Sequence, residues 1–207
     1  MKIICHKISS LYPNSIFGLI DNLNKGYKSF NIDVNTCKNE LILYNDNYFN
    51  GEHIQNLMKN DFLYNGKYCV NTFLELMSVF NNYNNINLFF NLKGIDPNIV
   101  DYICLIYNKF NQNNNYYFQS SNYKFIKKFK KNNNTISCGL KIQGYIPISY
   151  KMLKYIDFFC IEEDFYTHYV NYGKDIYLYG INNKKYYDSF IIENIKGIVT
   201  DYPELFN

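Results

Sequence analysis

Residues 87–110 read NLFFNLKGIDPNIVDYICLIYNKF and contain one complete strand-and-helix unit. The run Asn87–Leu92 is typical of a buried strand, because it is short, apolar and rich in β-favouring residues. Asp96 followed by Pro97 is typical of a helix start, with an N-cap acceptor and then proline at the first helical position. The apolar residues that follow recur at helical spacing and predict a helix over Pro97–Phe110. Strand-then-helix units are the building blocks of parallel sheets.

The same alternation continues in both directions along the chain. Further strands are expected at Lys2–Cys5, Ser29–Val34, Leu41–Tyr44, Tyr116–Gln119, Thr135–Leu140, Asp157–Ile161, Ile176–Tyr179 and Gly197–Val199. Further helices are expected at Ser15–Lys25, Asn71–Phe80, Tyr123–Lys131, Ile148–Tyr155, Phe165–Tyr172 and Lys184–Asn194. Since these strands exceed by one the number that an eight-stranded barrel needs, one of them is expected to be an extra. The pattern predicts an α/β fold, a small (β/α)8 TIM barrel, with an open doubly wound sheet as the alternative.

Size and composition favour a single domain over residues 1–207. Of the 207 residues, 47% are hydrophobic and 19% charged, which supplies enough apolar material for one buried core. The formal net charge of +3 is too small to predict nucleic acid as a partner. No signal peptide or membrane-spanning stretch is recognisable in the sequence, so a cytoplasmic protein is expected.

The basic residues and the cysteines limit the kinds of binding site that the chain can form. All 21 basic residues are lysine, so an anion site has to use Lys, His or backbone N–H groups instead of a guanidinium. The six cysteines include no C-x-x-C pair, which predicts buried free thiols and argues against a zinc or redox site. Alanine, arginine and tryptophan are absent while asparagine is abundant, a bias typical of an AT-rich genome.

Polar residues gather where the predicted strands end, which is where a barrel of this type places its site. These ends read Cys5-His6-Lys7, Asn31-Ile32-Asp33-Val34, Tyr44-Asn45-Asp46, Asn91-Leu92-Lys93-Gly94 and Thr200-Asp201-Tyr202-Pro203. A histidine, two lysines, an aspartate and several amides around a common mouth favour an anion such as a phosphate ester.

In order and spacing, these segments resemble the motifs of the glycerophosphodiester phosphodiesterase family. The matching segments, in chain order, are His6-Lys7-Ile8 at the family's His-Arg-Gly, Asn14 to Gly26 at its Pro-Glu-Asn-Thr helix, Phe30–Val34 at its Glu-x-Asp strand, Asn45-Asp46 at its His-Asp pair, Asn91-Leu92-Lys93 at its Glu-x-Lys, Gln119-Ser120 at its Ser-Phe strand end and Val199–Pro203 at its Thr-Asp-x-Pro. The resemblance runs from end to end. It implies a phospholipase-C-like phosphodiesterase barrel, a phosphoric diester hydrolase of lipid metabolism.

The family's metal ligands are mostly replaced. Members of the family bind a divalent cation through three carboxylates, and only Asp33 is kept here, with Asn31 and Asn91 at the other two positions. Because Mg²⁺ and Ca²⁺ prefer anionic oxygen, this set predicts no tightly bound cation and no other cofactor. Mg²⁺ or Ca²⁺ is expected only if the protein is active.

The family's acid–base pair is also incomplete. His6 is kept as the candidate catalytic residue, whereas Asn45 stands at the position of the second histidine. His53 lies in the polar loop beyond it and is considered as a replacement, although its spacing does not fix it at the mouth. Losing one acid or base typically costs about 10²- to 10⁴-fold in rate. The phosphate-binding candidates remain, with Lys7 where the family has arginine and Lys93 at its lysine.

These features predict a degenerate relative, a pseudoenzyme or weak enzyme that binds a small phosphoester or phosphodiester. An active hydrolase of glycerophosphodiesters that uses His6, and a barrel used only as an interaction module, are the alternatives, so enzyme status stays open.

Several candidate residues also have structural explanations. Lys93 would bind nothing if it were simply paired with Asp33, and Asp46 and Asp201 are expected to cap loops. The lysines between Lys124 and Lys131 are expected on the solvated face of a barrel helix whose aromatic residues pack on the sheet.

Overall fold

The computed structural model describes residues 1–6, 14–38, 40–64, 67–68, 70–94, 96, 98–110, 112–187 and 194–206. The barrel strands are β1 (Lys2–Cys5), β2 (Ser29–Cys37), β8 (Asn87–Leu92), β9 (Asn115–Ser120), β10 (Ser137–Ile142), β11 (Phe158–Glu162), β12 (Asp175–Tyr179) and β13 (Ile195–Thr200). Each pairs in parallel with its neighbour, in the order β2-β8-β9-β10-β11-β12-β13-β1. Cys5 of β1 pairs with Phe30 of β2 and closes the ring. The (β/α)8 barrel predicted from the sequence is therefore confirmed, and the open sheet is excluded.

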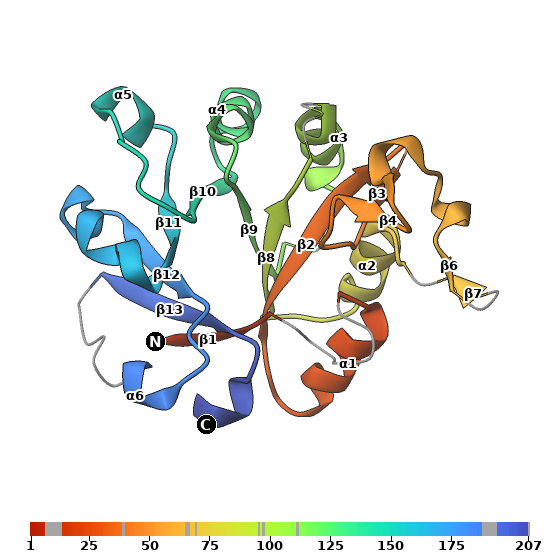
Figure 1. The fold of residues 1–207 in the computed structure, drawn as a ribbon, viewed down its shortest axis with the longest axis horizontal. Helices are drawn as coiled ribbons and strands as arrows, with labels where there is room; N and C mark the ends of the chain where they lie inside the picture. The colour runs from red at the N-terminus through yellow and green to blue at the C-terminus, as the bar shows by residue number, and fades with distance from the viewer. Residues whose placement is uncertain are drawn as a thin grey trace.

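The helices lie outside the strands (Figure 1). They are α1 (Ile16–Asn24), α2 (Phe73–Phe80), α3 (Asn98–Tyr107), α4 (Tyr123–Asn132), α5 (Tyr150–Leu153) and α6 (Lys184–Tyr187). The lysine-rich helix α4 buries Phe125, Ile126 and Phe129, as predicted. No helix in the described ranges has the length and apolar character needed to cross a bilayer.

The extra strand is the one expected at Leu41–Tyr44. β2 continues to Cys37, turns back, and pairs with β3 (Glu40–Ile42) in antiparallel register. Tyr44-Asn45-Asp46 is therefore not the end of a barrel strand, and this prediction is wrong. Residues between β3 and α2 instead form two small hairpins, β4 (Tyr48–Phe49) with β5 (Glu52–His53) and β6 (Leu63–Tyr64) with β7 (Lys67–Tyr68).

The helix expected over Phe165–Tyr172 is also wrong. The segment forms two 3₁₀ turns, Glu163–His168 and Val170–Tyr172, and ends at Gly173 in the left-handed region. Its aromatic and β-branched residues are poor helix formers. Tyr169 anchors it instead, since its hydroxyl donates to the Ile146 carbonyl at 2.9 Å and accepts from the Ile146 N–H at 2.8 Å.

One other expected helix is shorter than predicted, and another is described only at its start. Ile148–Tyr155 is reduced to α5, and Lys184–Asn194 begins with α6, while 188–193 lie outside the described residues. Other 3₁₀ turns occur at Ile54–Asn56, Lys59–Asp61 and Pro203–Phe206.

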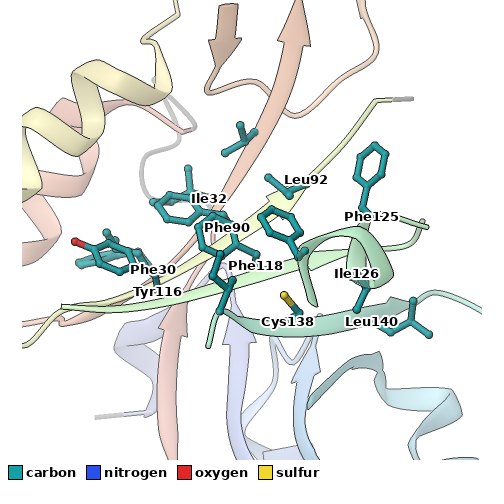
Figure 2. Packing of buried hydrophobic residues seen from close by; sticks show 14 of the residues in the cluster. Phe30, Ile32, Phe90, Leu92, Tyr116, Phe118, Phe125, Ile126, Cys138 and Leu140 are labelled. Carbon is teal, nitrogen blue, oxygen red and sulfur yellow. The ribbon is translucent and has the colours of Figure 1, made fainter. Parts of the chain in front are cut away.

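Strand alternation divides the buried residues into two groups, because successive side chains point to opposite faces. On β2, Phe30, Ile32 and Val34 point outward and pack against the helices. Figure 2 shows Phe30, Ile32, Phe90 and Phe118 gathered in this outer core. The barrel interior holds a second cluster, which consists of Ile4, Phe89, Phe158, Cys160, Tyr177 and Val199. Aromatic rings thus fill the barrel below the polar mouth.

The cysteines match the prediction of free thiols in the part of the chain that the structure describes. Cys5, Cys37, Cys138 and Cys160 are buried, Cys104 is half-buried, and all five are free. Burial raises the pKa of the Cys160 thiol to about 11, which keeps it protonated and unreactive. Cys69 lies outside the described residues.

Candidate functional site

His6 follows β1 and lies between two carboxylates. Its Nδ1 is 3.0 Å from Asp201 Oδ1, and its Nε2 is 3.6 Å from Asp33 Oδ2. Burial by itself lowers the pKa of His6, but the hydrogen bonds and charges of Asp201 and Asp33 outweigh burial and raise it. The two aspartates therefore orient the imidazole and favour its cationic form.

Asp201 has a different role from the loop cap expected for it. It follows the last barrel strand, where alternation turns its side chain toward the mouth, and it pairs with His6. Asn182 fixes the turn, because its Oδ1 accepts from the Asp201 N–H at 2.9 Å and from the Thr200 hydroxyl at 3.1 Å. The expectation of a simple cap is therefore wrong.

Asp33 lies on the inner face of β2 and is almost fully buried, with 2% of its surface exposed. Its Oδ1 accepts from Asn91 Nδ2 at 2.5 Å and lies 3.6 Å from Lys93 Nζ. Burial alone raises the pKa of this carboxyl, but the His6 hydrogen bond, the Lys93 charge and the Asn91 amide lower it to about 2. Asp33 is therefore ionised near neutral pH, and both of its oxygens face donors from the protein itself.

Lys93 connects Asp33 to the loop of residues 43–47 between β3 and β4. Beyond its ion pair with Asp33, its ammonium donates to the Asn45 carbonyl. The loop is also held by Asn35, whose Nδ2 donates to the Asp46 carbonyl at 3.0 Å. Asn45 thus reaches the mouth as predicted, although it comes from the connection between β3 and β4 and not from a barrel strand. The pairing of Lys93 with Asp33 considered from the sequence is present.

The residues present do not fit a hard divalent cation. Asn91 turns its N–H donor toward Asp33, and the Asn31 oxygen accepts from Gln119 Nε2 at 2.7 Å. Of the three positions Asn31, Asp33 and Asn91, only Asp33 carries a carboxylate, and it lies beside the ammonium of Lys93. Mg²⁺ and Ca²⁺ need several free oxygen ligands. Within the described ranges, no group of three or more His, Cys, Asp or Glu side chains could hold a metal ion.

A cavity of about 410 Å³ opens beside this cluster. Lys93 and Asn91 form the wall that it shares with the cluster, and His53, Gln55 and Lys141 are among its other lining residues. His53 accepts a hydrogen bond from the Gln55 N–H through Nδ1 at 3.3 Å, which leaves Nε2 as the donor. The structure therefore places His53 at the cavity, which its spacing alone did not establish.

The structure brings most of the predicted residues together and adds one. His6, Asp33, Asn91 and Lys93 form a single contact network, as their positions at strand ends predict. Lys141 was missed, because the expected strand Thr135–Leu140 ends one residue before it. Strand alternation counted from Gly139 is the signal that would have found Lys141. Lys7 lies outside the described residues.

Phosphodiesterases are among the solved structures to which this chain is similar. The chain is similar to a glycerophosphodiester phosphodiesterase from Parabacteroides distasonis, at 21% identity and a TM-score of 0.80, over 99% of this chain and 94% of that one. It is similar to an Oleispira antarctica phosphodiesterase in complex with the product sn-glycerol-3-phosphate, at 18% identity and a TM-score of 0.83, with the same coverages. A putative glycerophosphoryl diester phosphodiesterase from Silicibacter pomeroyi has 11% identity and a TM-score of 0.79, over 98% and 90%.

Neither a family model nor a curated relative matches the sequence. At these identities the likeness is one of fold. It shows that the chain has the same barrel fold as these phosphodiesterases, which carry the name of the family that the sequence motifs resemble.

Proposed function

We propose that this protein is a glycerophosphodiester phosphodiesterase-like barrel that binds a small phosphoester without a divalent cation and hydrolyses it weakly or not at all. The observation that carries the proposal is the engagement of Asp33, the single carboxylate kept from the family's metal site, by Lys93 and Asn91. A position that would face a cation in the family faces the protein's own ammonium group here.

The charges around the mouth support an anionic ligand. Among the described residues, Lys93 and Lys141 line the cavity together with one acidic residue, Asp46. The raised pKa of His6 favours its cationic form between Asp33 and Asp201. A phosphate oxygen in the cavity can accept a hydrogen bond from Lys93, and charge-assisted bonds of this kind are the strong ones. The Oleispira antarctica structure contains sn-glycerol-3-phosphate in the same fold, and we extend that ligand class to this chain.

Calorimetric titration of the full chain with sn-glycerol-3-phosphate in the presence of EDTA tests the proposal. The wild type is expected to bind, and Lys93→Met is expected to bind about 10- to 100-fold more weakly, because a charge-assisted hydrogen bond is lost. Lys151→Met, which removes an exposed lysine of α5, is the matched control and is expected to bind like the wild type. Thermal unfolding of each variant verifies that it is folded. Absence of binding by the wild type, or equal binding by Lys93→Met, would contradict the proposal.

The active hydrolase remains the second candidate, because His53 lines the same cavity as Lys93. In such a reaction one histidine takes the proton of the attacking water, and the other gives a proton to the leaving oxygen. Turnover of glycerophosphocholine with Mg²⁺ or Ca²⁺, abolished by His6→Ala, would establish this candidate in place of the first. A chain that neither binds nor turns over phosphoesters would be an interaction module.

A further inference from the structure

The cavity beside Lys93 has a second cation that the His6–Asp33 cluster does not use. Lys141 lines the cavity, and it has no carboxylate within ion-pair distance in the part of the chain that the structure describes. Its ammonium lies 4.6 Å from the centre of the Tyr179 ring. Lys141 is therefore able to receive an anionic or strongly polar group.

Hydrogen-bonding groups cover the remaining wall. Gln55 Nε2 is buried at the cavity without a partner among the described residues, and an unpaired buried donor gains stability when a ligand pairs with it. His53 offers Nε2–H, and Gln143 contributes an exposed amide. Amides both donate and accept, as hydroxyl groups do, so this wall is suited to a ligand with several hydroxyls.

The described lining of the cavity lacks the aromatic faces that a quaternary ammonium group needs. No Phe or Tyr is among the described residues that line the cavity. The nearby Tyr179 ring already has Lys141 over it. Recognition of choline depends on such aromatic faces, and a lysine in that position repels a second cation.

We propose that this cavity binds the alcohol half of the ligand, and that this alcohol is a polyol or sugar and not choline. The inference rests on the proposed function, because Lys93 would hold the phosphate that joins the two halves. It assigns Lys141 and Gln55 to ligand selection. The substrate class is then a glycerophosphodiester of inositol or of a similar polyhydroxyl alcohol.

Calorimetric titrations of the full chain with three probes test the inference: sn-glycerol-3-phosphate, glycerophosphoinositol and glycerophosphocholine. Wild type is expected to bind the inositol diester at least about tenfold more tightly than the choline diester, since each unpaired polar group left by choline weakens binding. Lys141→Met and Gln55→Leu are each expected to bring this ratio close to one. Gln55→Leu removes a hydrogen-bond donor without changing the charge, so it separates the effect of hydrogen bonding from that of electrostatic attraction. It also tests the inference on its own if Lys141→Met does not fold. Lys151→Met is the control that keeps the ratio.

The three probes separate the failure of this inference from failure of the proposed function. If sn-glycerol-3-phosphate binds but choline and inositol diesters bind equally, the inference is overturned and the proposed function stands. Unchanged selectivity in both variants also overturns it. If none of the three probes binds, both ideas are overturned.

Discussion

Single residues decide the chemistry of this mouth. The amide of Asn91 has nearly the shape of a carboxylate, yet its Nδ2 donates to Asp33 where a carboxylate would repel it. Together with Lys93, this amide stabilises the Asp33 anion. The same buried charge favours the protonated form of His6.

The pKa shifts of Asp33 and His6 predict how stability depends on pH. Folding lowers the pKa of Asp33 from 3.8 to about 2, so its contribution is present above pH 4 and is lost as the pH falls toward 2. Folding raises the pKa of His6, so its contribution is present below about pH 6.5 and is lost as pH rises through the raised value. These two groups therefore favour the folded state most between about pH 4 and 6.5.

Denaturant unfolding between pH 2.5 and 9 measures this dependence, with Asp33→Asn as the comparison. The variant is expected to lose less stability on the acid side, by about 2 kcal/mol, because its residue 33 no longer takes up a proton. The stability that the variant loses at alkaline pH is also expected to be smaller, because His6 then has one neighbouring carboxylate fewer to raise its pKa. Parallel pH profiles for the two proteins would show that Asp33 is not responsible.

The sequence predicted which residues belong to this network better than it predicted which of them pair with one another. His6, Asp33, Asn91 and Lys93 could be found because each stands at or near the end of a strand expected from the sequence, and parallel strands bring their ends together. The pairing of Asp201 with His6 spans nearly the whole chain, and no local pattern reports it. His53 reaches the cavity through a hairpin whose path depends on long-range contacts, so spacing alone could not place it.

At the scale of elements, the interior of the barrel depends on one small residue. Gly139 on β10 faces the ring of Phe158 on β11, and a Cβ at residue 139 would lie 2.1–2.4 Å from three carbons of that ring. Phe158 cannot easily move, because it is buried and packs edge-to-face against Phe89 and Tyr177. This glycine therefore makes room for the aromatic filling of the barrel.

Gly139→Ala is expected to lower the free energy of unfolding by about 1–3 kcal/mol through overpacking. Gly144→Ala is the matched control, because nothing lies within 4 Å of a Cβ there and its φ is not positive. Denaturant unfolding at one pH measures both. A Gly139→Ala protein as stable as the Gly144→Ala protein would mean that the Phe158 ring can move aside.

The strands were predicted more reliably than the helices, for a physical reason. Barrel strands are buried on both faces, so their apolar runs are continuous and easy to recognise. The segments that differed are those in which long-range contacts outweigh the local pattern. Ile42, from the strand expected at Leu41–Tyr44, pairs with Asn35 in a hairpin, and Tyr169, from the helix expected at Phe165–Tyr172, is held by Ile146.

At the scale of the molecule, the barrel combines an apolar body, which fixes the fold, with a polar mouth, which carries the candidate site. Its interior and outer layer are apolar, and they fix the strand ends in space. The mouth is polar, and its loops bring Asn45 and His53 over the side formed by β8 and β10, where Lys93 and Lys141 lie. Such a scaffold can keep its geometry while the chemistry of its mouth changes, because the two depend on different side chains.

The central claim is that the mouth binds a phosphoester without a divalent cation, and titration of the wild type with sn-glycerol-3-phosphate in EDTA, in Mg²⁺ and in Ca²⁺ tests it most directly. We predict the same affinity in all three buffers, and no heat of binding for either cation alone. An affinity at least about tenfold higher with Mg²⁺ or Ca²⁺, and lost in Asp33→Asn, would contradict the claim and show that Asp33 still serves a metal site.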